Sequence, residues 1–351
     1  MTVRDHMSQH EAAEELPMIT EGARVVAVET MDHNRHEEVH KVTSRLLDRH
    51  DCGDWLAEAE SANGKEIDWD VLAECWENSD EPPELTETLL TLRARSERPY
   101  PSLLRIEFEE EETDIDFVPG QYVTVRYDGT PRPYSIASSP NDEYVEICVR
   151  RVPGGTLTPR LADTIEEGDE VVLRGPNGDF TLQEPSARDV VFLATGTGVA
   201  PFKSMIDYTF QEGRDEYEKG KRDVWLFLGA GWKDDLAYRE AFQRLADECE
   251  NFHFVPTVSR EHCLTGWDGE TAYVQQTLLK YVADDALGGA DLPESAETVA
   301  EESPAYDIDA RIDPDHAEVY ACGTNAMVEG LTDTVSRIGV PNDCAESEGF
   351  G

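Results

Sequence analysis

The sequence predicts an antiparallel β-barrel followed by a parallel-sheet α/β domain, an α+β and α/β chain that begins with a mainly helical segment. In residues 1–84, apolar side chains recur at helical spacing, and Pro82-Pro83 then breaks the pattern. Residues 85–185 hold short apolar runs between turn residues, which is typical of antiparallel strands. In residues 186–351, near-continuous apolar strands alternate with helical stretches, which indicates a parallel sheet covered on both faces.

The expected strands follow from these apolar runs. In the barrel they are residues 89–94, 103–108, 121–127, 144–150 and 170–173. In the parallel sheet they are residues 190–194, 224–230, 252–259 and 319–322. A stretch at about 284–315 is acidic and rich in Ala, Pro and Gly, and it separates a predicted helix from the last strong strand. We expect it to be a solvated insertion, with a functional lid as the alternative.

Charge is the most unusual property of the chain, with 75 acidic and 30 basic residues and a formal net charge of -45. Such acidity disfavours nucleic acid and anionic membranes as partners. The acidic residues are spread beside ordinary apolar strands, which suggests a surface adapted to high salt, where the Debye length falls to about 3 Å at 1 M. No apolar run approaches the roughly 20 residues of a membrane span. We therefore expect a cytoplasmic protein of an extreme halophile, without membrane insertion.

Cysteine and histidine spacing predicts no metal site. The seven cysteines form neither a CxxC pair nor a ferredoxin spacing, so reduced thiols are expected rather than an iron–sulfur cluster or a disulfide framework. Residues 36–40 match the zinc pattern HExxH. The surrounding segment is rich in His and Glu, and no motif marks a third ligand. The pattern is therefore interpreted as a coincidence.

A first candidate site follows a predicted strand at Arg132-Pro133-Tyr134-Ser135. Arg pairs with a diphosphate through its planar fork, Tyr stacks on a flat ring system such as a flavin, and Ser supplies a hydroxyl. About twenty residues later, Gly154-Gly155 leads into a short helix, where free amides favour phosphate binding. Residues 175–180 form a third Gly-containing turn. Singly, each pattern also fits an ordinary strand end or hairpin.

A second candidate site is the turn Thr195-Gly196-Thr197-Gly198, between a buried strand and a helix. With Pro201 expected at the first position of the helix, this geometry presents free amides to an anionic ligand. Pro201 stands where the third Gly of a Rossmann fingerprint would be, so the turn by itself does not specify a dinucleotide.

The order of the motifs over residues 85–351 resembles that of ferredoxin-NADP reductases, especially the bacterial type. The family pattern runs RxYS, GxLSPRL, GTGxAP, LFLGxxxxxDLxYxxEF, VSRE, CGxxxM and a C-terminal acid with an aromatic residue. The same order occurs here, with Thr158 in place of the usual Ser. Because chance matches do not keep their order, the ordered set is far more specific than any one motif.

This resemblance implies FAD and a nicotinamide nucleotide as cofactors, with a separate ferredoxin or flavodoxin as the electron carrier. Residues expected at the FAD are Arg132, Pro133, Tyr134, Ser135, Cys148, Val149, Gly155, Leu157, Thr158 and Phe350. Residues expected at the nucleotide are Gly196, Thr197, Gly198, Gly323 and Met327. The catalytic residues implied are Ser135 near flavin N5, Cys322 beside the nicotinamide ring, and the C-terminal acid Glu348. Phe350 replaces the family's Tyr or Trp, and Gly351 follows it.

The residues at the adenosine end favour NADP(H) over NAD(H). Ser259 and Arg260 lie at the end of a predicted strand and resemble the pair that grips the 2'-phosphate. Tyr273 and Gln275 resemble the adenine-stacking segment. Against this, Trp267-Asp268-Gly269 resembles the pattern of NAD-using relatives, so NAD(H) stays an alternative.

Three functions stay open at this point. The leading one is an NADP(H)-dependent reductase of a ferredoxin or flavodoxin. A flavin or oxygenase reductase component is a close alternative, and an FAD-containing redox sensor without turnover belongs to a different class. Cys322 and Glu348 argue against the sensor, because sensing requires no hydride-transfer geometry. Residues 1–84 are expected to be a cap or docking module, and the oligomeric state stays open.

Overall fold

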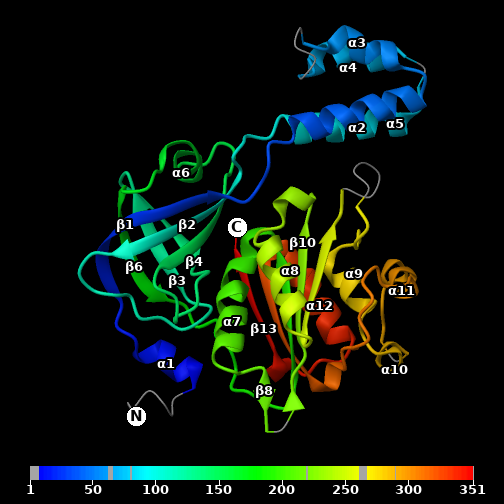
Figure 1. The fold of residues 1–351 in the computed structure, drawn as a ribbon. Coiled ribbons are helices and arrows are strands. Elements are labelled where there is room, and N and C mark those ends of the chain that lie inside the picture. The colour runs from blue at the N-terminus through cyan, green and yellow to red at the C-terminus, as the bar shows by residue number, and fades with distance from the viewer. Residues whose placement is uncertain are drawn as a thin grey trace. The chain divides into compact units, whose positions relative to one another are not determined.

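The computed structural model describes residues 8–61, 66–79, 81–218, 220–260, 267–288 and 290–350 (Figure 1). The chain divides into two compact units. One comprises Met1–Met31 together with Leu103–Gly351, and the other is Asp32–Ser102. The smaller unit is therefore inserted into the larger one.

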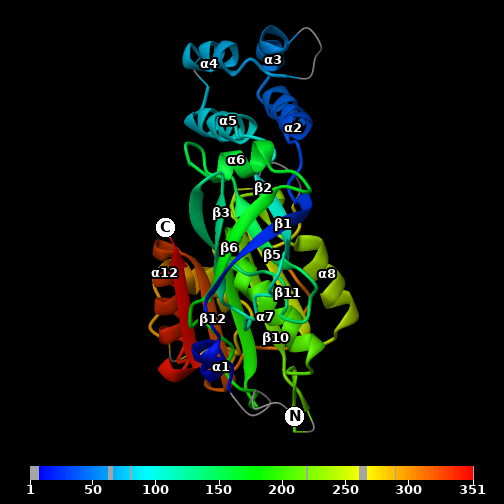
Figure 2. The same ribbon diagram turned by 90° about the vertical axis from the view of Figure 1, so that its left-hand side faces the viewer.

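The first sheet of the larger unit is antiparallel and barrel-like, as the sequence predicts. Its strands are β1 (Ile19–Thr30), β2 (Leu103–Glu110), β3 (Tyr122–Tyr127), β4 (Thr130–Ser135), β5 (Val145–Arg150) and β6 (Glu170–Asn177). They lie in the order β4-β3-β6-β1-β2-β5, with antiparallel pairing throughout. Val, Ile, Leu and Phe side chains of alternate positions fill the interior, since successive strand residues face opposite sides. Figure 2 shows β1 running across this sheet.

The mainly helical segment 1–84 also contains a strand that the sequence analysis did not expect, because β1 lies within it and pairs with β2 and β6. One expected strand is wrong. Residues 89–94 are not a strand but part of helix α5 (Pro83–Ser96). Leu85, Leu89 and Leu92 are buried along α5 at intervals of four and three residues, which is the period of a helix. In an apolar run as short as residues 89–94, this period cannot be distinguished from the pattern of a buried strand. The helical segment thus does not precede the barrel but interrupts it after its first strand.

The smaller unit is helical. Its helices are α2 (His36–Arg49), α3 (Gly53–Ala59), α4 (Trp69–Glu77) and α5. At its ends, buried Asp32 accepts hydrogen bonds from the Ser102 amide at 3.0 Å, the Ser102 hydroxyl at 2.6 Å and the Arg35 guanidinium at 2.7 Å. Directly beside it in the chain, the Met31 amide donates to the Leu103 carbonyl at 2.9 Å. Hydrogen bonds therefore hold the two ends of the inserted segment side by side.

The second sheet of the larger unit is parallel, which confirms the predicted α/β domain. Its strands are β7 (Asp189–Thr195), β10 (Val224–Ala230), β11 (Phe252–Val258), β12 (Ala317–Thr324) and β13 (Ala345–Phe350), in the order β11-β10-β7-β12-β13. One face packs on α7 (Val199–Gln211) and α8 (Arg239–Glu248). The other packs on α9 (Val274–Leu279) and α12 (Asn325–Arg337).

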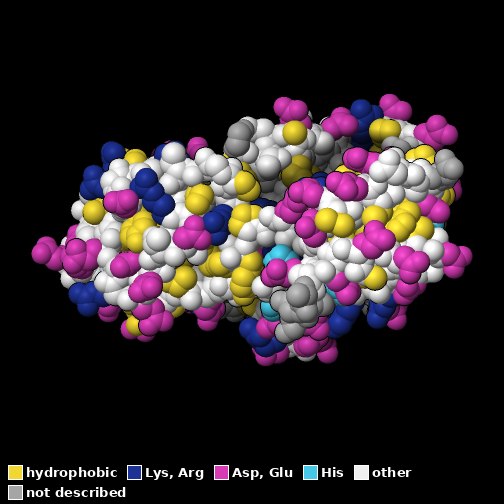
Figure 3. All heavy atoms as spheres, turned by 90° about the horizontal axis from the view of Figure 1, so that it is seen from above, with side chains coloured by type: hydrophobic (Ala, Val, Ile, Leu, Met, Phe, Trp, Pro, Cys, Tyr) yellow, Lys and Arg dark blue, Asp and Glu magenta, His cyan; other side chains and the backbone are white. Residues whose placement is uncertain are grey.

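Shorter elements complete the fold. They are α1 (Gln9–Glu15), α6 (Thr158–Thr164), β8 (Glu216–Tyr217), β9 (Gly220–Lys221), α10 (Asp284–Leu287), α11 (Glu294–Ala300) and 3-10 turns at Gly196–Gly198, Lys233–Asp235, Pro314–His316 and Asn342–Cys344. Within the described residues, no helix combines the length and apolar character that a bilayer crossing requires. Figure 3 shows Asp and Glu side chains spread over the visible face rather than gathered in one patch.

The acidic stretch 284–315 is tied to the parallel-sheet domain by several hydrogen bonds. The carboxylate of Glu270, which is 2% exposed, accepts hydrogen bonds from the Ala305 amide at 2.7 Å and the Tyr281 hydroxyl at 2.9 Å. The Tyr306 hydroxyl donates to the Pro256 carbonyl on β11 at 3.3 Å. These contacts hold the second half of the stretch against the parallel sheet.

Candidate functional site

Strand β4 places the first motif on an edge of the barrel sheet. Tyr134 pairs with Val123 of β3, and Ser135 pairs with Tyr122. The Tyr134 ring is half-buried against the barrel core, and its hydroxyl is buried without a hydrogen-bond partner among the described residues. Burial raises the pKa of Tyr134 to about 12. Since buried polar groups are normally hydrogen-bonded, this hydroxyl is suited to a ligand that supplies the partner.

Arg132 connects this edge to the glycine turn that follows β5. The exposed Arg132 guanidinium donates to the Thr156 hydroxyl at 3.0 Å. Within the turn, the Thr158 hydroxyl accepts from the Val152 amide at 2.9 Å, so Thr performs the local role open to the usual Ser. A Cβ on Gly155 would lie 2.9 Å from the Val152 carbonyl oxygen, which only glycine avoids. The cation, the turn and β4 thus form one cradle.

The remaining residues predicted at the flavin take different positions. Cys148 and Val149 are neighbours on β5 and face opposite sides. Cys148 is buried in the core cluster of the parallel-sheet domain, whereas the Val149 side chain fills the barrel interior. Leu157 is also buried in the barrel core, just before α6. Pro133 is exposed on β4. Cys148 therefore reaches the junction of the two domains, and Val149 and Leu157 support the cradle from inside.

The second motif lies at the carboxyl edge of the parallel sheet. After β7 the chain continues to β10 on one side, whereas β12 lies on the other side. This is the topological switch point where α/β sheets bind ligands. A Cβ on Gly198 would lie 2.5 Å from the Cys322 carbonyl oxygen, and one on Gly323 would lie 2.1 Å from the Thr195 hydroxyl oxygen. These close approaches bring Gly196, Thr197 and Gly198 against the end of β12.

Cys322 and Glu348 meet on neighbouring strands of this edge. The two residues pair across β12 and β13, and Cys322 is 1% exposed. Burial and the nearby charge of Glu348 raise the pKa of the Cys322 thiol well above its usual range. Burial, and then the charge of Asp179, raises the pKa of Glu348. The thiol is therefore neutral, and the carboxyl binds a proton more readily than an exposed Glu does.

The C-terminal aromatic residue ends the same strand. Phe350 pairs with Thr324, the last residue of β12, and is 41% exposed. Met327, on the first turn of α12, is 42% exposed. Both side chains are available to a ligand at the carboxyl edge of the sheet.

The predicted adenosine-end residues follow β11. The Ser259 amide donates to the Ala230 carbonyl and the Arg260 amide to the Gly231 carbonyl, both at 3.1 Å. This pairing extends the parallel ladder past β10 and leaves the Arg260 side chain exposed. Tyr273 precedes α9 and is 59% exposed, and Gln275 lies in the first turn of α9.

Trp267 of the competing NAD-type pattern already has intramolecular partners. Its indole N–H donates to the Glu270 carbonyl at 2.8 Å. The Arg239 guanidinium carbon lies 5.1 Å from the centre of its ring, within cation–π range. Residues 261–266, between this Trp and Arg260, lie outside the described part of the chain.

Arg150 is a site residue that the sequence reasoning missed. It ends β5, and its guanidinium forms an ion pair with the buried carboxylate of Asp235 at 3.0 Å. The same guanidinium would lie 3.5 Å from a Cβ on Gly196. A cation from the barrel therefore reaches the glycine turn of the parallel sheet. The only signal in the sequence is an Arg at a strand end, directly after Cys148-Val149.

The two His of the HExxH pattern have other partners. His40 Nε2 lies 2.9 Å from a Glu60 carboxylate oxygen, and His36 Nδ1 lies 3.3 Å from the Ser96 hydroxyl oxygen. Across the described ranges, no group of three His, Cys, Asp or Glu side chains is arranged to hold a metal ion.

Comparison with known families assigns both domains. Residues 100–182 match the oxidoreductase FAD-binding domain, and residues 192–333 match the oxidoreductase NAD-binding domain. The chain therefore carries an oxidoreductase FAD-binding domain followed by an oxidoreductase NAD-binding domain. The barrel edge with the buried Tyr134 hydroxyl lies in the FAD-binding domain, and the glycine turn lies in the NAD-binding domain.

Several curated proteins resemble these two domains. Protein RfbI of Salmonella typhimurium is 33% identical over 47% of this chain and 47% of its own length. The chloroplastic ferredoxin–NADP reductase of Mesembryanthemum crystallinum is 31% identical over 63% of this chain and 60% of its own. The reductase component of propane 2-monooxygenase from Rhodococcus jostii is 28% identical, over 66% and 55%. The chain thus spans about half to three-fifths of these relatives.

Solved structures share the fold. A ferredoxin NADP+ reductase from Neisseria gonorrhoeae with bound FAD and NADP has a TM-score of 0.53 at 20% identity, covering 71% of this chain and 92% of that one. The ferredoxin reductase in carbazole 1,9a-dioxygenase has a TM-score of 0.60 at 17% identity, covering 96% and 71%. At these identities the likeness concerns the fold alone.

Proposed function

We propose that the protein is an oxidoreductase that transfers hydride between NAD(P)H and FAD, and single electrons to or from a separate carrier such as a ferredoxin or flavodoxin. The observation that carries the proposal is the pairing of Cys322 with Glu348 beside the Gly196–Gly198 turn. A buried neutral thiol and a proton-binding carboxyl at this edge suit turnover. A protein that only senses its redox state has no need of them.

The residues of the cradle fit FAD. In this proposal Arg132 pairs with the diphosphate, Tyr134 stacks on the ring system and finds a partner for its hydroxyl, and Ser135 approaches N5. Bound FAD supplies the change from two-electron to one-electron transfer. Glu348, with its raised pKa, holds or releases a proton at its carboxyl near this site.

The nucleotide is proposed to be NADP(H). The exposed Arg260 side chain follows β11 with Ser259 beside it, which suits the 2'-phosphate of the adenosine. Arg150 lies over the Gly196 turn and suits the nucleotide diphosphate. NAD(H) stays the alternative, because residues 267–269 resemble the pattern of NAD-using relatives. Trp267 of this pattern is held by contacts with the Arg239 guanidinium and the Glu270 carbonyl.

An oxygenase reductase component is the second candidate. It is favoured by the relative from Rhodococcus jostii, whose name describes a monooxygenase reductase component. In that case the electron carrier is a protein of an oxygenase system instead of a free ferredoxin or flavodoxin.

The charge of -45 supports a cytoplasmic role in an extreme halophile. At multimolar salt the repulsion among exposed carboxylates is screened within about 3 Å, so the folded state tolerates it. A protein that keeps its full secondary structure after dialysis into dilute buffer would contradict this part of the proposal.

Reduction of the bound flavin tests the central claim. The protein is purified in multimolar salt, loaded with FAD, and mixed anaerobically with NADPH or NADH in a stopped-flow spectrophotometer. We expect rapid bleaching of the flavin, with NADPH effective at the lower concentration. A panel of ferredoxins, flavodoxins and oxygenase components then identifies the carrier. An FAD-loaded protein that neither nucleotide reduces would refute the proposed function.

A further inference from the structure

A buried polar cluster joins the FAD-binding domain to the NAD-binding domain. Glu146 lies on β5 of the barrel and is 2% exposed. Lys203 lies on α7 of the NAD-binding domain, and its side chain is 13% exposed. Tyr238 immediately precedes α8 and is 7% exposed. All three residues belong to the larger unit of the chain.

Lys203 bridges the two domains. Its ammonium group lies 3.6 Å from a Glu146 carboxylate oxygen and donates to the Ala137 carbonyl at 3.4 Å, both on the barrel side. On its own helix it pairs with Asp207 at 2.9 Å. The other Glu146 oxygen accepts from Arg105 on β2 at 2.5 Å. Both charges are therefore compensated although water is largely excluded.

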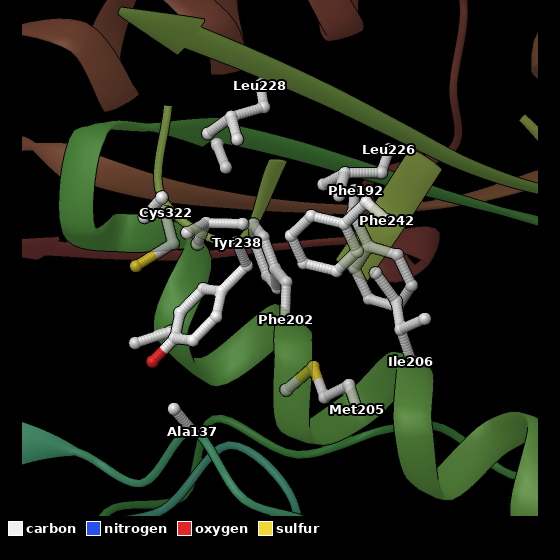
Figure 4. Packing of buried hydrophobic residues seen from close by; sticks show 14 of the residues in the cluster. Ala137, Phe192, Phe202, Met205, Ile206, Leu226, Leu228, Tyr238, Phe242 and Cys322 are labelled. Atoms are coloured by element: carbon white, nitrogen blue, oxygen red, sulfur yellow. The ribbon is translucent and has the colours of Figure 1, made fainter. Parts of the chain in front are cut away.

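Tyr238 completes this cluster from a second element of the NAD-binding domain. Its backbone has φ +58°, a left-handed conformation that a bulky residue rarely adopts. The Lys203 ammonium group lies 5.3 Å from the centre of its ring. Figure 4 shows the Tyr238 hydroxyl directed toward Ala137 of the barrel. Burial raises the pKa of this hydroxyl, and the neighbouring Cys148 and Glu146 on β5 raise it further. The left-handed backbone therefore holds the Tyr238 side chain at the junction, beside two residues of the barrel.

A buried ion pair is a poor source of stability, because desolvation offsets most of the attraction. It does, however, penalise any displacement that separates the two charges. Apolar packing, such as that of Phe202 and Met205 in the core cluster of the NAD-binding domain, would tolerate small shifts more readily. The cluster therefore favours one relative placement of the domains. Cys148 of the barrel and Cys322 of the parallel sheet lie in the same core cluster, so that placement also fixes the separation of the two sites.

We propose that Lys203, Glu146 and Tyr238 form an interdomain latch that positions the nicotinamide nucleotide against the flavin. This inference rests on the proposed hydride transfer. The three residues are positioning residues, because they act through the placement of the domains.

Kinetic separation of binding from transfer provides the first test. Lys203→Met keeps most of the side-chain length and removes the charge. We expect the rate constant for flavin reduction at saturating NADPH to fall about tenfold or more, because small misplacements strongly slow transfer. The dissociation constant of NADPH and the flavin content should stay close to those of the wild type. Lys203→Arg, which keeps the charge, should restore most of the rate. Lys41→Met, which removes an exposed ion pair with Glu37, is the matched control.

Thiol labelling provides a readout that requires no turnover. Cys148 and Cys322 are buried at the junction, whereas Cys344 is buried in the core cluster on the opposite face of the parallel sheet. Iodoacetamide labelling, followed by mass spectrometry, should modify Cys148 and Cys322 at least about threefold faster in Lys203→Met than in the wild type. The labelling rate of Cys344 should stay at its wild-type value. Faster labelling of Cys344 would indicate that the NAD-binding domain has unfolded.

Unchanged transfer and unchanged labelling in Lys203→Met would overturn the latch. If Cys344 labelling also accelerates, the variant has unfolded, and Glu146→Gln then decides by the same two measurements. A wild-type rate in that variant overturns the proposal. Labelling is measured without nucleotide, so it tests the latch even if the wild-type flavin proves inert to NAD(P)H, a result that would refute the proposed function instead.

Discussion

Tyr134 and Ser135 show how one strand presents two different groups to a ligand. As neighbours on β4 they face opposite sides, so the ring of Tyr134 packs on the barrel core while Ser135 projects the other way. Arg132 shares the face of Tyr134 and is tied to Thr156. The cradle is thus specified by strand alternation and a single long-range hydrogen bond.

Ser135→Ala tests the proposed contact of this hydroxyl with the reacting end of the flavin. We expect flavin reduction by NADPH to slow by about an order of magnitude or more while FAD stays bound, since one hydrogen bond near the reaction centre is lost. Stopped-flow absorbance measures the rate. Thr130→Ala, at the start of the same strand, should be neutral. Reduction at the wild-type rate in Ser135→Ala would remove Ser135 from the catalytic residues.

Tyr134→Phe should raise the thermal stability of the protein without FAD and should weaken its binding of FAD. Without FAD, the buried hydroxyl lacks a partner among the residues that the structure describes, a state that costs about 1–3 kcal/mol, so the Phe variant should melt at a higher temperature. With FAD, the lost hydrogen bond should weaken binding about tenfold. Thermal unfolding and FAD titration measure the two effects. A variant that is less stable without FAD would show that the hydroxyl is satisfied within the protein.

At this scale the sequence predicts residues that lie within one motif and misses those that meet across domains. Arg132, Tyr134 and Ser135 occupy one strand, so their spacing reveals them. Arg150 and Tyr238 act across the junction of the two domains, and no local pattern records which turn or charge they will meet. Tyr238 also depends on a left-handed backbone that the sequence does not signal.

Among the elements, the glycine turn after β7 depends on backbone contact with β12. Gly198→Ala would place a methyl group 2.5 Å from the Cys322 carbonyl oxygen, and neither backbone can yield without moving a central strand. We expect weaker NADPH binding and a lower melting temperature, measured by titration and thermal unfolding. Gly220→Ala, which meets open space, is the control. Normal binding in Gly198→Ala would contradict the assignment of this turn to the nucleotide.

The strands expected from the sequence agree best with those of the structure where nearly every residue of the strand is buried. Strands β7, β10 and β11 are buried along nearly their whole length, and the sequence predicts each of them within a few residues. β1 was missed because its buried positions Ala23 and Val25 alternate among charged residues and a bulge follows. β13 carries the polar sequence AESEGF and is held by its pairing with β12, which only the folded sheet supplies.

For the whole molecule, the position of the Asp32–Ser102 unit predicts that it is dispensable for cofactor binding. The chain leaves the barrel after Met31 and returns at Leu103, and the two residues share a hydrogen bond. Replacement of Asp32–Ser102 by a short Asn-Gly turn should therefore join β1 and β2 as a hairpin. We expect FAD binding and NADPH-driven reduction within about threefold of the wild type. Loss of FAD binding would show that the helical unit supports the barrel.

The buried carboxyl groups predict how stability changes with pH. Burial raises the pKa of several of them, namely Glu110, Asp189, Asp207, Glu318, Glu346 and Glu348. The native state then binds more protons than the unfolded state above the ordinary carboxyl range, so the free energy of unfolding falls as pH rises. Melting temperatures at constant high salt should be higher near about pH 5.5 than near about pH 8. A flat or rising profile would contradict these shifts.

The insertion between β1 and β2 also determines the order in which the parts of this protein can be completed during its synthesis. β1 leaves the ribosome first, but its partners β2 and β6 are made only after the whole of Asp32–Ser102. Helices close local contacts quickly, whereas pairing of distant strands is slow. The inserted helices can therefore fold while both edges of β1 are still unpaired. The charges of Glu21 and Glu29 on β1 then disfavour its pairing with strands of other nascent chains.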